Sequence, residues 1–177
     1  MTIRLRATMA AAAAATVALS CVLTGTAKAS TAAPARAGTW YVPSASVLVA
    51  TPGCGKGANV RKVVATYKAK KHQAAGYRTD TLYCGNNTYG YRHLEPHIGQ
   101  YFGGWASFSY AMAQTLKAPA KVVAQDNGNY LESAPIYQCF FAGYYVIWTF
   151  FVVPEISSGK IVTASGRAGR TVNQPCP

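Results

Sequence analysis

Apolar residues recur at helical spacing in a first stretch that follows Asn59, at Val60, Val63, Val64 and Tyr67. The positions i, i+3, i+4 and i+7 predict a helix with Asn59 as its N-cap. The other positions of this stretch are basic, which favours either a solvated face or a track for an RNA backbone. They are Arg61, Lys62, Lys68, Lys70 and Lys71. His72 continues this basic run, and we expect it on the surface.

A second amphipathic pattern predicts a helix over residues 105–116. Its apolar positions are i, i+3, i+7 and i+11, and Pro119 marks its end. These four residues are predicted to form part of the core: Trp105, Phe108, Met112 and Leu116.

The period changes after Pro119 from helical to strand-like. Residues 121–125 and 130–134 flank Asp126-Asn127-Gly128-Asn129, and Asn-Gly is a strong hairpin signal because these residues tolerate a positive φ. The fifteen residues from Cys139 to Val153 carry no charge. This run is shorter than the roughly 20 residues of a membrane span, and Ala142-Gly143 interrupts it, so we predict a turn followed by a long buried strand.

Further strands are predicted at residues 79–84 and 160–164. The order favours an α+β fold in which N-terminal helices pack on a C-terminal antiparallel sheet of about four strands.

The N-terminus has the pattern of a secretory signal peptide over residues 1–29. Arg4 and Arg6 precede an uncharged, mostly apolar stretch, and Ala27-Lys28-Ala29 forms an A-x-A cleavage site. Cys21 leaves a lipoprotein open as an alternative, although Ala18-Leu19-Ser20 fits that signal poorly. We therefore expect a secreted, extracellular protein with a flexible lead-in at residues 30–38 and one α+β domain at residues 39–177.

Four cysteines remain after the predicted cleavage, and an even number in an exported chain predicts two disulfides. All three pairings are open at this point. The cysteines have no C-x-x-C pair, so we expect neither a zinc site nor another metal or cofactor. They are Cys54, Cys84, Cys139 and Cys176.

The predicted mature chain is strongly basic. Removal of residues 1–29 takes three of the 17 basic residues and none of the five acids, which leaves a formal net charge of +9. A surplus of this size favours polyanionic partners such as RNA, anionic lipid or acidic cell-wall polymer, although charge of this kind also keeps secreted proteins soluble.

Candidate chemistry is concentrated in two short segments. Residues 90–97 (GYRHLEPH) place His93 and His97 beside Arg92, and residues 159–167 (GKIVTASGR) end in hydroxyls and Arg167. Histidine suits both proton transfers of RNA cleavage because its pKa of about 6.5 is close to neutrality.

We therefore assign His93 and His97 as candidate acid and base, with Glu95 as an alternative base. Thr163 or Ser165 would donate to the scissile phosphate, with Arg92 and Arg167 as charge stabilisers. Because Pro is favoured at the first helical position, we predict a helix that begins at Pro96, with His93 in the preceding loop.

These two segments, together with the helix, hairpin and long strand between them, resemble the small bacterial toxin domains of the barnase, EndoU, colicin and RelE type. The resemblance covers roughly residues 77–167. It implies a helical part packed on a four-stranded antiparallel sheet, metal-independent ribonuclease activity, and catalytic roles for His93, His97 and Thr163. Pro96 departs from the uninterrupted helical R-H-x-x-x-H pattern of that group.

Two hypotheses follow. The first is a secreted, metal-independent endoribonuclease or toxin domain, for which a small acidic immunity protein is the partner to look for. The second is a non-enzymatic basic module that binds cell-wall polymer or envelope partners. In that case aromatic side chains form the contact surface: Tyr89, Tyr91, Tyr101, Phe102 and Trp105.

Overall fold

The computed structural model describes residues 39–41, 52–102, 104–140 and 143–176. The predicted signal peptide and lead-in lie outside the described residues, as does the predicted cleavage site. Residues 35–177 cluster as one unit of the chain.

The main sheet is antiparallel from β4 to β7, as the sequence predicts. Its strands are β4 (Lys121–Ala124), β5 (Tyr130–Phe140), β6 (Tyr144–Pro154) and β7 (Ile161–Val172). β5 pairs with β4 and β6, and β6 pairs with β7. The short β1 (Thr39–Tyr41) runs parallel to β5 at Ile136–Gln138, farther along the edge that pairs with β4. The predicted hairpin and the break between β5 and β6 are confirmed.

The β4–β5 turn shows why its sequence is a hairpin signal. The Gln125 N–H donates to the Asn129 carbonyl at 2.9 Å, and the Gly128 N–H donates back to the Gln125 carbonyl at 3.2 Å. Gly128 has a φ of 78°, a left-handed conformation that glycine adopts without a steric penalty.

A second, two-stranded sheet precedes the helices, and here the predicted helix after Asn59 is wrong. Residues 63–70 form β2 (Val63–Lys70), which pairs antiparallel with β3 (Tyr77–Tyr83). Tyr67 and Ala69 are buried and alternate with exposed lysines, so burial follows a period of two. Asn59 accepts a hydrogen bond from the Arg61 N–H at 2.9 Å and closes a turn instead of capping a helix.

Along the sequence, the two helices follow β3 and precede β4. α2 (Trp105–Lys117) confirms the predicted helix and ends before Pro119. α1 (Tyr91–Phe102) begins five residues before Pro96, so the predicted start at Pro96 is wrong. Pro96 removes one hydrogen bond from α1, but the helix continues through it because α1 buries an apolar stripe of Tyr91, Leu94 and Ile98.

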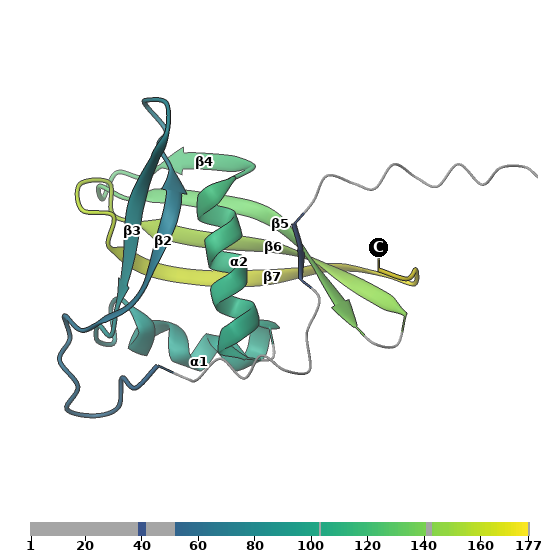
Figure 1. Cartoon of the computed structure of the whole chain (residues 1–177), viewed down its shortest axis with the longest axis horizontal. Helices are drawn as coiled ribbons and strands as arrows, with labels where there is room; N and C mark the ends of the chain where they lie inside the picture. The colour runs from purple at the N-terminus through teal and green to yellow at the C-terminus, as the bar shows by residue number, and fades with distance from the viewer. Residues whose placement is uncertain (1–38, 42–51, 103, 141–142, 177) are drawn as a thin grey trace, which may run out of the picture. The chain divides into compact units, whose positions relative to one another are not determined.

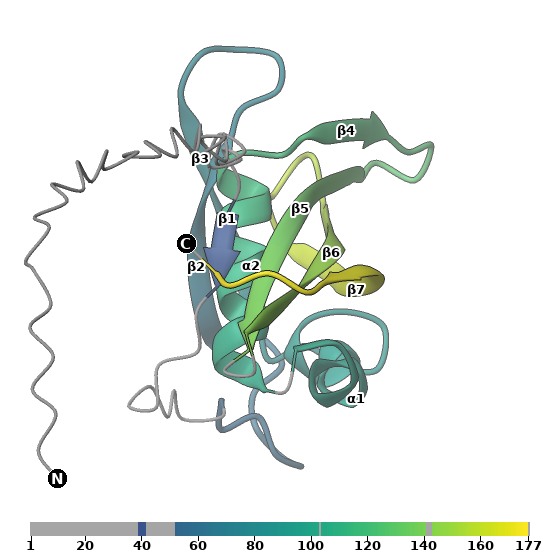
Figure 2. The same cartoon turned by 90° about the vertical axis from the view of Figure 1, so that its right-hand side faces the viewer.

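The core lies between the main sheet and the layer formed by α2 and the β2–β3 hairpin (Figures 1 and 2). The rings of Phe108 on α2 and Phe150 on β6 meet edge to face, with centroids 5.0 Å apart, and both side chains are fully buried. The α+β class is therefore correct, whereas the predicted order of helices before sheet is not, because β2 and β3 precede both helices.

Two disulfides cross-link distant segments of the described residues. Cys54 bonds to Cys84, and Cys139 at the end of β5 bonds to Cys176 beyond β7. Both are compatible with an extracellular protein. None of the helices in the described part of the chain is long and apolar enough to cross a membrane.

Candidate active site

His93 and His97 lie one helical turn apart on α1, with ring centroids 6.3 Å apart and planes at 79°. A spacing of four residues puts two side chains on one helical face, and the helix that persists through Pro96 preserves that arrangement. His93 Nδ1 lies 2.9 Å from the Asn87 carbonyl oxygen. If Nδ1 carries the proton of the neutral ring, this contact leaves Nε2 as the basic nitrogen.

The first turn of α1 is anchored to β7 and to the end of β3. The Gly90 N–H donates to the Val162 carbonyl at 3.2 Å, and the Arg92 N–H donates to the Cys84 carbonyl at 3.0 Å. Gly90 has a φ of 78°, and a Cβ there would lie 2.6 Å from the Tyr83 carbonyl oxygen, so the approach requires glycine. α1 packs against β7, the strand that carries the other predicted site residues.

The Arg92 guanidinium is directed at the backbone of its own fold. Its Nε donates to the Cys54 carbonyl, Nη1 to that of Gly85, and Nη2 to those of Gly55 and Ala58, at 2.8–3.1 Å. Arg92 thereby holds the loop after Cys54 beside α1. The predicted contact between Arg92 and phosphate stays a prediction.

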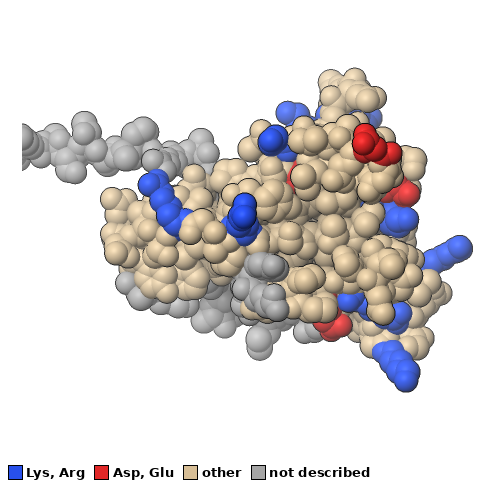
Figure 3. Space-filling view, turned by 180° about the vertical axis from the view of Figure 1, so that it is seen from behind, with Lys and Arg blue, Asp and Glu red and all other residues tan. Residues whose placement is uncertain are grey.

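Thr163, Ser165 and Arg167 lie together on β7. They alternate with buried Ala164 and Gly166 and are opposite Val153, Phe151 and Thr149 of β6, respectively. Since Ala164 belongs to the core, this alternation directs the two hydroxyls and Arg167 toward the other face of the main sheet. Figure 3 shows the molecule from that side, where Lys and Arg are scattered among uncharged residues and do not gather into one patch.

Glu95 is exposed on α1 and is close to Tyr91. Burial, followed by the charge of Glu95 and a hydrogen bond with it, raises the pKa of the Tyr91 hydroxyl above its usual value. Its exposure leaves Glu95 as an alternative base.

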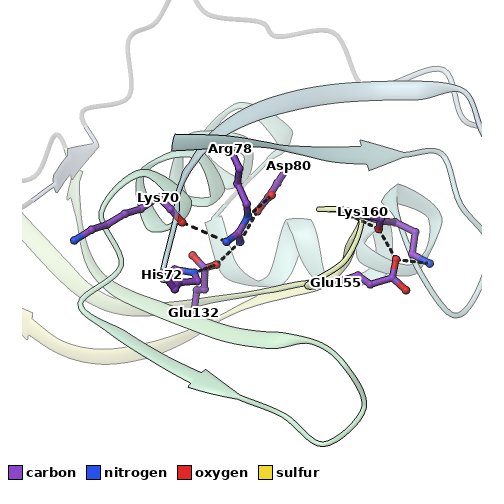
Figure 4. A network of polar contacts seen from close by, with 8 residues as sticks. Lys70, His72, Arg78, Asp80, Glu132, Glu155 and Lys160 are labelled. Atoms are coloured by element: carbon purple, nitrogen blue, oxygen red, sulfur yellow. Dashed lines mark hydrogen bonds and ion pairs between the residues drawn. The ribbon is translucent and has the colours of Figure 1, made fainter. Parts of the chain in front are cut away.

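The structure also contains a charged network that sequence reasoning missed (Figure 4). Arg78 on β3 makes a two-pronged contact with Asp80, from Nε to Oδ1 at 2.7 Å and from Nη2 to Oδ2 at 3.0 Å. Arg78 Nη2 also donates to Glu132 Oε1 on β5 at 2.8 Å, and His72 Nε2 lies 2.7 Å from the same oxygen. The prediction of a surface His72 is wrong, because only 11% of its side chain is exposed.

Both carboxylates of this network are fully buried. Burial raises the pKa of Glu132, and the hydrogen bonds and charges of His72 and Arg78 offset that rise only in part. Burial by itself would lower the pKa of Arg78, but Asp80 and Glu132 outweigh it and raise that pKa. One signal was available in the sequence, since Glu132 occupies an inward position between Tyr130 and Ala134 of a predicted strand.

No three His, Cys, Asp or Glu side chains form a candidate metal site in the part of the chain that the structure describes. No protein-family model, curated protein or solved structure matches this chain.

Proposed function

We propose that this protein is a metal-independent endoribonuclease in which His93 and His97 carry the two proton transfers. The observation that supports the proposal is the pairing of both imidazoles on one face of α1, 6.3 Å apart, in a helix packed against the strand that bears Thr163. Two imidazoles at this separation are close enough to act on the same phosphodiester.

His93 is the proposed base, since a proton on Nδ1 shared with the Asn87 carbonyl leaves Nε2 to accept one. His93 removes the proton of the 2′-hydroxyl, and the 2′-oxygen forms a bond to phosphorus. The bond from phosphorus to the 5′-oxygen breaks, and His97 donates the proton that the leaving 5′-oxygen takes. The products are a 2′,3′-cyclic phosphate and a free 5′-hydroxyl.

Negative charge develops on the phosphoryl oxygens during this step. Thr163 and Ser165 supply hydroxyl donors, and Arg167, which is exposed on the same strand, supplies the positive charge. Arg92 acts in the proposal as a positioning residue, because its donors are engaged by backbone carbonyls around the start of α1.

The test is cleavage of a labelled RNA in EDTA by the purified chain with both disulfides formed. We expect products that end in a 2′,3′-cyclic phosphate, and no cleavage of the matching 2′-deoxy oligonucleotide. His93→Ala and His97→Ala should each reduce the rate by about 10²–10⁴-fold. Lys56→Ala is the control, since it removes an exposed cation from the loop after Cys54, outside both α1 and the β2–β3 hairpin.

Two outcomes would contradict the proposal. Intact RNA with the wild-type chain rules out the activity, and binding of an anionic cell-wall polymer by that inactive chain would favour the non-enzymatic module. Full activity of His93→Ala with loss of activity in Glu95→Gln would transfer the role of base to Glu95.

A further inference from the structure

The two faces of the β2–β3 hairpin differ in charge and burial. Residues opposite each other in an antiparallel pair share a face, so Tyr67 and Asp80 lie on the buried face. Lys68 is opposite Thr79 and Lys70 is opposite Tyr77 on the other face, where all four residues are exposed.

A pocket of about 330 Å³ opens where this exposed face meets the end of α2. Lys70 and Tyr77 line it from the hairpin, and Lys117, in the last turn of α2, lines it from the other side together with Ala118 and Pro119. Tyr77 is 47% exposed, and Lys68 Nζ lies 4.2 Å from the centre of its ring. The pocket therefore combines an aromatic ring with lysines that converge from two elements.

The wall of the pocket is held by the buried network. Arg78 Nη1 donates to the Lys70 carbonyl at 3.3 Å, while the other nitrogens of the same guanidinium bind Asp80 and Glu132. These contacts fix the backbone of Lys70, so the position of its side chain on the exposed face is built into the fold.

The positive charge of the pocket has no carboxylate beside it. Two of the five acids of the chain, Asp80 and Glu132, are fully buried and engaged by Arg78. Glu155 pairs with Lys160, while Glu95 and Asp126 lie on α1 and in the β4–β5 turn. None of the ion pairs among the described residues involves Lys70 or Lys117. A ligand that carries negative charge would complete the site.

We infer that this pocket, lined by Lys70, Tyr77 and Lys117, is a second binding subsite for single-stranded RNA, remote from the histidines. The lysines bind backbone phosphates and the Tyr77 ring stacks on a base, which is the combination that single-strand-binding proteins use. A polymer with charge but no bases would make no stacking contact with the ring. This inference rests on the proposed function, since it gives the same substrate a second point of attachment.

The position of the pocket determines which substrates can use it. β3 begins at Tyr77 beside the pocket, and its far end leads through Cys84 to the start of α1. Seven strand residues span roughly 23 Å at about 3.3 Å per residue. Figure 1 shows the tip of the hairpin and α1 at opposite ends of β2 and β3. Only an RNA of several nucleotides reaches both sites, so the subsite should favour long substrates over short ones.

The experiment measures binding of fluorescent 2′-O-methyl RNA by anisotropy, because this RNA has no 2′-hydroxyl to react. A 12-mer and a 3-mer are titrated over a series of salt concentrations with the purified full chain. For Lys70→Gln/Lys117→Gln we expect binding of the 12-mer to weaken about tenfold or more and the slope of log K against log salt to fall by about 1.4. Tyr77→Ala should weaken binding of the 12-mer by roughly 5- to 100-fold.

Lys56→Gln/Arg170→Gln is the matched control, since it removes the same charge from two exposed positions outside the pocket. It should change binding of the 12-mer much less than the pocket variant does. Equal losses in both variants would overturn the inference, because the attraction would then depend on net charge alone. Displacement of the 12-mer by poly(glycerol phosphate) at equal phosphate concentration would also overturn it, in favour of a cell-wall polymer.

Cleavage assays separate this inference from the proposed function. If Lys70→Gln/Lys117→Gln cleaves long RNA at the same rate as the wild-type chain, the subsite is rejected and the histidine mechanism is left intact. Binding that depends on the pocket, in a wild-type chain that cleaves no RNA, would support the subsite and reject the nuclease.

Discussion

Replacing Arg78 with methionine should destabilise the protein more than any other loss of a single positive charge from the β2–β3 hairpin. The substitution keeps an unbranched side chain of similar length but removes the cation that contacts two fully buried carboxylates, Asp80 and Glu132. Four hydrogen bonds from the guanidinium disappear with it, three to the carboxylates and one to the Lys70 carbonyl. Of the two side chains that contact Glu132 Oε1, only His72 then remains.

The expected loss is about 3–5 kcal/mol in the free energy of unfolding, the usual cost of removing one partner of a buried ion pair. A domain of this size has a total stability of roughly 5–15 kcal/mol, so the loss is a large fraction of it. Lys71→Met, which removes an exposed charge close by, should change stability by no more than about 0.5 kcal/mol.

Urea unfolding followed by tryptophan fluorescence, with both disulfides intact, measures this difference. With a slope near 2 kcal/mol per M, the midpoint of Arg78→Met should lie about 2 M below that of Lys71→Met. Asp80→Asn, added to Arg78→Met, should recover at least about 1 kcal/mol because it removes one unpaired buried charge. Equal midpoints for Arg78→Met and Lys71→Met would refute the assigned role of the network.

The effect also has a predicted pH dependence. Burial raises the pKa of Glu132 above its ordinary value of 4.5, so the folded chain binds this proton more tightly than the unfolded chain. The stability that the folded chain gains from binding this Glu132 proton is fully present below pH 4.5, and it is lost as the pH rises through the raised pKa. Since Arg78 lowers that pKa, its removal raises it further, and the deficit of Arg78→Met should shrink as the solution is acidified.

Two further substitutions test local geometry. Gly159→Ala should lower stability by about 1–3 kcal/mol more than Gly57→Ala, as measured by thermal unfolding. Both glycines have a positive φ, but a Cβ at position 159 would lie 2.7 Å from Asp80 Oδ1, whereas a Cβ at position 57 would meet no atom within 4 Å. Equal effects would show that the close approach at Gly159 is relieved without cost. Arg92→Met should lower the free energy of unfolding by at least about 2 kcal/mol and speed proteolysis of the loop after Cys54, because four carbonyls lose a charged donor. The control is Arg61→Met at an exposed position, and equal proteolysis of the two variants would contradict the role of Arg92 in holding this loop.

Local patterns were sufficient for the second helix and for most of the main sheet. The apolar stripe of α2 and its end before Pro119, the Asn-Gly turn between β4 and β5, and the break between β5 and β6 all depend on neighbours within a few positions. Such features can be predicted because one short segment satisfies its own backbone and presents one apolar face.

Two predicted elements were wrong where packing outweighed a local preference. Val63, Val64 and Tyr67 fit a helix as well as a strand, and the choice came from pairing with β3 and from burial of Tyr67 and Ala69 beneath exposed lysines. Pro96 disfavours a helix that surrounds it, but burial of Tyr91, Leu94 and Ile98 outweighs the lost hydrogen bond.

The candidate site divides in the same way. The chain by itself determined that two histidines stand four residues apart and that hydroxyls and an arginine alternate near its end, because spacing is a property of the backbone. Only the tertiary structure decided that Arg92 would bind carbonyls as many as 38 positions away, and that His72 would lie against Glu132, 60 positions along the chain. The physical reason is that a side chain's partners and its distance from water depend on which distant segments fold against it, and this information lies in no local stretch of residues.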